Sequence, residues 1–414
     1  MGKIELKSRS EKLIYVRQIL NVTQKDLAGE TLTREFISMV ESEKRNMSKD
    51  VAITIMKNAI NYAKERGIPL DLDEEFIART KEEDLCKLCD ELPNTTENMA
   101  FCDEIMAYAE ENDYLWAKIM VTKKIGNILF VNKEISKAYE KYILCLNMID
   151  RLNSNKMKEN IYNCIGSVKL QMTQYDEALT YYNEAINYCY INNKFQIKNS
   201  IEYNLSWVYY NLNDFNKSLN KINDALLEDL NKALYFKFKL LEGANYIELD
   251  RVDDALNIYE IMLKDDKIND RSKSLLYSNI ALCYMHKEDY DKADKYLDLG
   301  MVSAKFVPNL IYKILLDKGE LNKKLGKYKE AKKVLIEGMK LMENVEDYEY
   351  QLKYLRELYY IEECEENYDE MINIVKKVLD ISKNNELKDE IIWSIKAFVG
   401  IAKNTRDLTI LNYI

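Results

Sequence analysis

The sequence predicts an all-α protein made of a short helical head and a long array of repeated helix pairs. The chain has 414 residues but only 11 Gly and 3 Pro, too few turn formers for an architecture of strands and tight turns. After about residue 118, a pattern of bulky and small side chains returns seven times at helical spacing. A chain of this length can bury a large core and should contain more than one unit.

Residues 22–45 predict two short helices joined by a tight turn. The side chain of Thr23 can cap the first helix, and Leu27 and Ala28 fall on its inward face. Because Ala28 is small, another helix can cross closely at that point. Thr33 can cap the second helix in the same way.

The second of these helices would bury one face and expose the other. Ile37 and Val40 are three residues apart and share the buried side. The opposite side and the residues just beyond it carry polar and cationic groups: Arg34, Glu35, Ser38, Lys44 and Arg45. A helix that recognises DNA needs this arrangement, with hydrogen-bonding side chains towards base edges and cations at flanking phosphates.

The stretch resembles the Cro/repressor-type (Xre-like) helix-turn-helix family over roughly residues 8–66. The shared pattern is Thr23-Gln24, Leu27-Ala28, Ile37-Ser38 and Val40-Glu41. The resemblance implies a five-helix domain, with Gln24 at a phosphate and the exposed side chains of the second helix near bases. The spacing from Ala28 to Ile37 is one residue short for the family, so residues 29–32 must turn differently. The predicted DNA-binding residues are Gln24, Lys25, Thr33, Arg34, Glu35, Ser38, Lys44 and Arg45.

Charge is distributed unevenly along the chain. Residues 1–67 carry 13 Lys and Arg against 9 Asp and Glu, a net charge of +4, whereas the remainder has a net charge of −14. A basic head on an acidic body favours phosphate contact by the head alone. The alternatives are a solvated charged face, and a helical domain that kept the fold and lost its DNA affinity.

Composition also limits the chemistry and the compartment. The eight Cys are scattered, and the charged N-terminus does not resemble a secretion signal, so we expect reduced thiols in a cytoplasm. Cys86-x-x-Cys89 has no second pair nearby, and two core-facing residues are favoured over a metal or redox site. No apolar run approaches the ~20 residues of a membrane span. With a single His, His286, and no nucleophile motif, phosphate loop or metal-ligand set, the sequence predicts a protein that is not an enzyme and has no cofactor or metal.

The repeated pattern has four members. A bulky residue is followed by a small residue three positions later, a second bulky residue four positions after that, and a second small residue three positions further on. The copies are 37 to 40 residues apart and begin at Ile135, Tyr175, Phe215, Val252, Tyr290, Tyr328 and Tyr368. A small residue, where a second helix must cross closely, lies twelve residues before the second member of six copies: Gly126, Gly166, Ser206, Gly243, Ala281 and Gly319. The last copy has Tyr359 there instead.

This pattern resembles tetratricopeptide repeats over roughly residues 115–380. The period is longer than the usual 34 residues, which we assign to helix extensions and turns. The resemblance implies a right-handed superhelix of about seven repeats with a concave face. The predicted divisions are a helix-turn-helix domain at 1–67, a helical linker at 68–114 with helices around Cys86 and Ile105, a repeat domain at 115–384 for peptide binding and dimerisation, and a C-terminal capping helix at 385–414.

In this repeat geometry the first helix of each pair lines the concave face. Asn side chains offer a donor and an acceptor to a peptide group, aromatic side chains form pocket walls, and Lys123 and Lys124 could hold a terminal carboxylate. Any single Asn could equally be ordinary surface, because the whole chain is rich in Asn and Tyr. The predicted peptide-binding residues are Lys123, Asn127, Asn163, Ser167, Gln171, Tyr203, Asn204, Trp207, Tyr210, Asn279 and Leu282.

A Cro/repressor-type head followed by tetratricopeptide-like repeats resembles the RRNPP family of quorum-sensing regulators, of which the phage arbitrium receptors are a close variant. The resemblance implies a cytoplasmic homodimer, without membrane contact, that binds a double-stranded DNA operator under the control of a short signalling peptide. One alternative is a tetratricopeptide interaction scaffold, or an arbitrium-type regulator, whose head is altered or no longer binds DNA. The other is an enzyme or phosphatase-like regulator.

Overall fold

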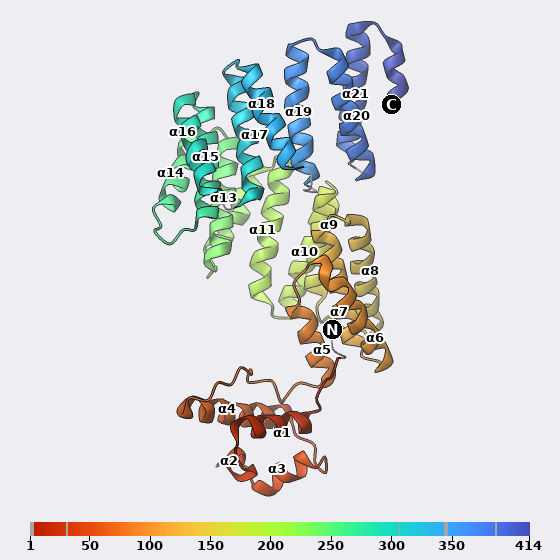
Figure 1. Cartoon of the computed structure of the whole chain (residues 1–414), viewed down its shortest axis with the longest axis vertical. Helices are drawn as coiled ribbons and strands as arrows, with labels where there is room; N and C mark the ends of the chain where they lie inside the picture. Colours follow the sequence, from red (N-terminus) through yellow and green to blue (C-terminus); the bar gives the residue numbers. More distant parts are fainter. Residues whose placement is uncertain (1–3, 30–31, 306, 343–346, 386) are drawn as a thin grey trace. The chain divides into compact units, whose positions relative to one another are not determined.

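The computed structural model describes residues 4–29, 32–305, 307–342, 347–385 and 387–414, and every regular element in these ranges is a helix (Figure 1). The all-α prediction is confirmed. Contacts divide the chain into two compact units, Met1–Ser154 and Asn155–Ile414.

The first unit contains a four-helix head, a connecting helix and the first helices of the array. Its elements are α1 (Arg9–Leu20), α2 (Gln24–Ala28), α3 (Arg34–Glu41), α4 (Lys49–Arg66), α5 (Lys81–Glu91), the 3-10 turn η1 (Thr96–Asn98), α6 (Met99–Glu111), α7 (Leu115–Val131) and α8 (Ile135–Arg151). Helices α5 and α6 include Cys86 and Ile105, the two centres of helix predicted for the linker.

The second unit contains the remaining helices of the chain. Its elements are α9 (Lys158–Gln171), α10 (Tyr175–Ile191), α11 (Phe195–Asn211), α12 (Phe215–Leu226), α13 (Lys232–Glu248), α14 (Val252–Leu263), α15 (Asp270–His286), α16 (Tyr290–Ser303), α17 (Pro308–Lys324), α18 (Tyr328–Leu341), α19 (Tyr348–Cys364), α20 (Tyr368–Asn384), α21 (Lys388–Thr405) and the 3-10 segment η2 (Leu408–Tyr413).

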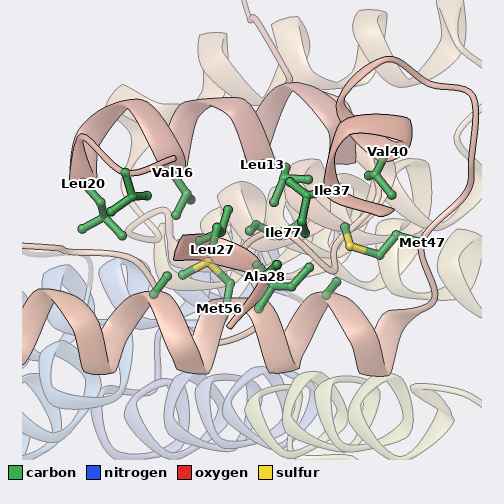
Figure 2. Packing of buried hydrophobic residues seen from close by; sticks show 14 of the residues in the cluster. Leu13, Val16, Leu20, Leu27, Ala28, Ile37, Val40, Met47, Met56 and Ile77 are labelled. Carbon is green, nitrogen blue, oxygen red and sulfur yellow. The ribbon is translucent and has the colours of Figure 1, made fainter. Parts of the chain in front are cut away.

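The head packs its four helices around a single apolar core (Figure 2). Leu27, Ala28, Ile37 and Val40 are all buried there, as their spacing predicts. Ile77, well beyond α4, is fully buried in the same core. The five helices implied for residues 8–66 are therefore wrong: the described part of that range contains four, and a non-helical segment supplies the additional packing.

Side-chain caps fix where the short helices of the head begin. Thr23 accepts a hydrogen bond from the backbone N–H of Asp26, whose carboxylate accepts one from the N–H of Thr23. Thr33 accepts from the N–H of Phe36 at 3.1 Å. Both predicted caps are confirmed. Of the unusual turn between these helices, Glu30 and Thr31 lie outside the described residues.

Helix α5 is joined to the head by a network of charges in which Lys12 and Arg79 are buried. Lys12 of α1 is almost fully buried, pairs with Asp84, and donates to the carbonyl of Arg79 at 2.9 Å. The guanidinium of Arg79 donates to Asp84 at 2.9 Å and to Asp73 at 2.6 Å. Burial lowers the pKa of Lys12, and Asp84 opposes that effect. We call Lys12, Asp73, Arg79 and Asp84 the joint.

The same helix is also held by α7. The Glu82 carboxylate accepts from the backbone N–H of Trp116 at 2.7 Å, at the first turn of α7. Lys124 donates to the carbonyls of Asp90 and Leu92, at the C-terminal end of α5. Lys124 is buried, so its predicted contact with a peptide carboxylate is wrong: its ammonium satisfies the last carbonyls of a helix.

In the described residues, seven helix pairs follow, from α7/α8 to α19/α20. The second helix of every pair begins at the first residue of a copy of the repeated pattern. Each turn within a pair contains one residue with positive φ, two positions before the second helix: Lys133, Thr173, Asn213, Asp250, Glu288, Gly326 and Glu366. The repeat register predicted from sequence is therefore confirmed.

The predicted small residues are where the two helices of a pair cross. A Cβ added at Gly126 would lie 2.7 Å from the ring of Tyr142, and one at Gly243 would lie 2.4 Å from the ring of Tyr259. Real Cβ atoms do not approach other atoms so closely, so only Gly fits opposite these rings.

In the second unit the first helices of the pairs form one layer. Consecutive first helices approach each other more closely than consecutive second helices do, from α9 and α11 to α17 and α19. An array bends towards the side on which its helices are closer, so the first helices line the inward face. Helix α21 packs on α20 and buries Phe398 at the end of the array.

Candidate functional sites on the head and on the inward face of the repeats

Helix α3 presents a polar face to solvent. Arg34, Glu35 and Ser38 are exposed, on the side opposite the buried Ile37 and Val40. The structure thus brings the predicted base-contacting side chains together on one accessible surface.

The cations next to this face are also accessible. Lys44 and Arg45 follow α3 and are exposed, as is Lys25 on α2. The guanidinium of Arg45 lies 4.9 Å from the centre of the Phe36 ring, which limits how freely this long side chain moves. Thr33 differs from the rest because its hydroxyl is occupied as the α3 cap.

Gln24 is held inside the head by a partner that the sequence does not reveal. The Glu41 carboxylate accepts from the amide nitrogen of Gln24 at 2.7 Å and from Arg17 at 2.7 Å. This bridge links α1, α2 and α3. The bridge gives a structural reason for the presence of both Gln24 and Glu41 in the helix-turn-helix pattern. The amide carbonyl oxygen of Gln24 takes no part in the bridge and remains available at the surface.

On the inward face, Asn163 of α9 and Asn204 of α11 form one unit. The amide nitrogen of Asn204 donates to the carbonyl oxygen of Asn163 at 3.0 Å. The NH₂ of Asn163 and the carbonyl of Asn204 keep capacity for further bonds. Both side chains are half-buried, so the pair presents a donor next to an acceptor at a partly desolvated position.

Three predicted aromatic residues of α11 have different surroundings. Trp207 stacks on Tyr210 with ring centres 5.5 Å apart and keeps 38% of its surface exposed. Tyr203 meets Phe238 of α13 edge to face at 5.5 Å, and burial raises its pKa. Tyr203 therefore belongs to the packing between repeats. Its ring is occupied by the fold although the sequence predicts it as a peptide contact, and of these three aromatic side chains Trp207 is the most open to a ligand.

Two predicted peptide contacts are occupied by the repeat fold itself. The carbonyl oxygen of Asn127 accepts from the hydroxyl of Tyr142 at 2.9 Å, and the Ser167 hydroxyl lies 3.1 Å from that of Tyr182. Each follows a Gly that admits the tyrosine ring. These polar side chains satisfy a hydroxyl that would otherwise be buried without a partner.

The remaining predicted residues are distributed along the array. Gln171 is exposed, Asn279 is half-buried, and Leu282 packs against the core between α15 and α17. Lys123 is half-buried on α7 in the first unit.

The structure adds a polar residue that the sequence analysis missed, Asp317 of α17. Ser278 of α15 donates to the carboxylate of Asp317 of α17. Ser278 and Asp317 lie three and two positions before the small residues of their helices, as Asn163 and Asn204 do. Burial raises the pKa of Asp317 to about 7. Counting from the small residue could have located Asp317, but the predicted contact list stopped before α17.

No group of His, Cys, Asp and Glu in the described residues is arranged to hold a metal ion. Cys89 is buried in α5, and burial raises its pKa to about 12, so it is held as a thiol. Among the described helices, none combines the length and apolar character that a membrane crossing requires.

Comparisons with known proteins agree with this architecture. The tetratricopeptide repeat family matches residues 160–190, 275–300 and 312–344. The fold is a tetratricopeptide-like array. A comparison with curated proteins finds no match.

The solved structures that this chain is similar to are distant in sequence. The apo form of the quorum sensor NprR from B. thuringiensis is 14% identical, with 89% of this chain and 99% of that chain covered and a TM-score of 0.53. A tetratricopeptide repeat protein from Parabacteroides merdae is 15% identical, with 67% and 98% covered and a TM-score of 0.47. Bacillus thuringiensis PlcR, in complex with the peptide PapR7 and DNA, is 13% identical, with 73% and 99% covered and a TM-score of 0.39. Of these three, NprR alone has a TM-score above 0.5, and at 14% identity the likeness extends to the fold and no further.

Proposed function

We propose that this protein is a DNA-binding transcription regulator whose activity is controlled by a short peptide bound on the inward face of its repeats. The observation that carries the DNA-binding part is the exposed face of α3. Arg34, Glu35 and Ser38 point to solvent from a helix anchored by Ile37 and Val40. Arg and Ser side chains can bond base edges in the major groove, and the neighbouring cations can contact phosphates.

The peptide-binding part is supported by the Asn163–Asn204 pair and by Trp207. A peptide group needs an acceptor for its N–H and a donor for its C=O, and the pair offers both side by side. The half-exposed indole of Trp207 supplies an apolar wall on the same helix as Asn204. A peptide in such a groove is the kind of signal that the RRNPP resemblance implies.

Regulation of one DNA site by such a protein requires a dimer. A single small head buries too little DNA for a specific site, and two half-sites are bound by two copies related by symmetry. We propose a homodimer in a cytoplasm, formed through the repeats. Light scattering on the full chain should give twice 48.8 kDa, and a monomer at all concentrations tested would remove this part of the proposal.

The DNA-binding proposal is tested by selecting duplexes from a random pool with the full-length protein and measuring their affinity by fluorescence anisotropy. Arg34→Ala should weaken the selected site by about 1–3 kcal/mol and reduce its preference over unrelated DNA. Lys44→Ala should weaken all sequences alike and flatten the dependence on salt. Lys64, exposed in the last turn of α4, is the matched control. If no duplex is enriched, the head does not recognise DNA and the protein is an interaction scaffold.

The peptide proposal is tested by affinity selection of random hexapeptides on the full chain, followed by calorimetry with an enriched peptide. Asn204→Ala should weaken binding by roughly 1–3 kcal/mol because it leaves a buried peptide group unpaired. Asn220, exposed on the second helix α12, is the control, and Asn220→Ala should bind as the wild type does. Equal losses in the two variants would place the ligand elsewhere.

A further inference from the structure

Three cationic side chains belong to the N-terminal parts of successive first helices: Arg271 of α15, Lys313 of α17 and Lys353 of α19. Two of them meet at one aromatic ring. The ammonium of Lys313 lies 4.4 Å from the centre of the Tyr350 ring, and that of Lys353 lies 4.8 Å from it. Lys313 is one helical turn before Asp317, so it lies near the polar inward position that Asp317 and Ser278 share.

Lys313 differs from its neighbours in its pairing. On the same helix, Lys318 pairs with Asp298 and Lys323 pairs with Glu357 at 2.5 Å. Lys353 pairs with Glu349 at 2.6 Å. Among the described residues, Lys313 is half-buried and has no ion pair.

The surrounding charges do not compensate for this. Burial lowers the pKa of Lys313, and Asp347 and Glu349 oppose this effect from a distance, whereas Lys353 and Arg271 add to it. Asp347 already accepts from the hydroxyl of Tyr312 at 2.9 Å, and Glu349 is taken by Lys353. A half-buried ammonium without a counterion reduces the stability of the free protein. Proteins retain such groups where a function uses them.

We propose that Lys313, together with Tyr350 and Lys353, forms an anion subsite that holds a carboxylate of the bound peptide. The subsite rests on the peptide-binding function proposed above and adds the requirement that the peptide carry a negative charge. Asp347 and Glu349 repel a dianion such as phosphate more strongly than a single carboxylate, which favours the carboxylate. Its source is either the C-terminus of the peptide or an acidic side chain.

The first test needs no ligand. Lys313→Met removes the unpaired charge and keeps an unbranched side chain on the Tyr350 ring, so the midpoint of thermal unfolding should rise. Lys318→Met removes a paired charge from the same helix and should leave the midpoint unchanged or lower it. A midpoint that falls for Lys313→Met as far as for Lys318→Met, or further, overturns the proposal, because Lys313 would then be structural.

The second test uses three pools of synthetic hexapeptides on the full-length protein. The first pool has free C-termini and no Asp or Glu, the second has amidated C-termini and no Asp or Glu, and the third has amidated C-termini and one Asp or Glu. Wild type should retain the first or the third pool about tenfold more than the second, the ratio expected for one charge-assisted bond. Enrichment of the first identifies a C-terminal carboxylate, and enrichment of the third identifies an acidic side chain.

The variants complete this test. Lys313→Met should lose the preference and retain the charged pools no better than the uncharged one, whereas Lys318→Met should behave as the wild type. Equal retention of all three pools by the wild type overturns the anion subsite and leaves the peptide-binding function standing. Retention of no pool overturns both. An unchanged preference in Lys313→Met shows that another cation selects the charge and also overturns the subsite.

Discussion

The joint and the inward face of the repeats are both built from polar side chains, but only the joint is saturated. Lys12 has lost nearly all contact with water and is bonded to a carboxylate and a carbonyl, and Arg79 bonds two carboxylates. On the inward face, Asn163 and Asn204 share a single bond, and Lys313 has no ion pair in the described residues.

This difference distinguishes polar side chains whose bonds are all used by the fold from polar side chains that can still bond a ligand. A saturated buried group contributes little when intact, but removing its partner is costly. A group with unused bonding capacity in a half-buried position gives up some stability in the free protein and can recover it from a ligand. Removing a single side chain should therefore destabilise the joint much more than the inward face.

The largest expected effect is at the joint. Asp84→Asn leaves the buried Lys12 ammonium without its counterion, and the free energy of unfolding of the first unit should fall by about 3–5 kcal/mol. Denaturant unfolding followed by circular dichroism measures this. Combining Asp84→Asn with Lys12→Met removes the orphaned charge and should restore most of the loss. If the double variant is as unstable as the single one, the joint is not held by charge.

A second difference concerns pH. Bonds from Arg79 and Lys87 hold the pKa of Asp73 below its ordinary value near 3.8, so this carboxylate stabilises the fold fully above pH 4 and the contribution is lost as the pH falls. Burial raises the pKa of Asp317, so its contribution is full below pH 4 and is lost as the pH rises through about 7.

The two aspartates should thus give slopes of opposite sign. Denaturant midpoints measured from pH 3 to pH 8 should show less acid sensitivity in Asp73→Asn than in the wild type. For Asp317→Asn, the stability of the variant relative to the wild type should instead be higher at pH 8 than at pH 4. The same slope in both variants would contradict the contrast between the regions.

A smaller effect is expected at the asparagine pair. Asn204→Ala removes one half-buried hydrogen bond, and the free energy of unfolding should fall by about 0.5–1.5 kcal/mol, well below the loss at the joint. Chemical denaturation of the full chain measures it. A loss comparable to that of Asp84→Asn would mean that the pair is part of the structural network rather than a site for a ligand.

The smallest effect is expected in a turn that belongs to neither region. Thr173 has a φ of 57°, in a region that β-branched residues disfavour. Thr173→Asn should stabilise the protein by roughly 0.5–1 kcal/mol, because Asn tolerates this backbone better. The same denaturation experiment measures it, with Asn213 in the equivalent turn as the natural reference. No gain would show that the Thr173 side chain compensates for its backbone.

Periodicity and capping explain what the sequence predicts well. The starts of the second helices and the small crossing residues follow from steps of three and four along one helix, which depend on local geometry alone. The caps at Thr23 and Thr33 are equally local, because each side chain bonds a backbone group three residues on.

Contacts between distant residues explain what the sequence does not predict. Lys124 and Lys123 are adjacent in the sequence, but only the burial of Lys124 against the end of α5 shows that its ammonium is occupied. Tyr203 and Trp207 are both aromatic residues of α11, and nothing in the sequence shows which of them is open to a ligand. Their exposure differs because Phe238 packs on the ring of Tyr203. The turn residues escaped prediction for a simpler reason, since six of the seven positive-φ positions lack the glycine that would mark them.

The close approach of glycine and tyrosine inside the repeats has an evolutionary consequence. Gly126, Gly166 and Gly243 each face a tyrosine sixteen residues later, and Gly319 faces Leu335 at the same separation. A larger residue at either position leaves no room for its partner, so a change at one is tolerated only with a compensating change at the other. Where the first residue is the larger Ser206 or Ala281, the position sixteen residues later holds Ile222 or Leu297, which are smaller than tyrosine. In an alignment of homologous chains, these two columns should therefore vary as a pair, and each repeat is inherited with its own matched combination of sizes.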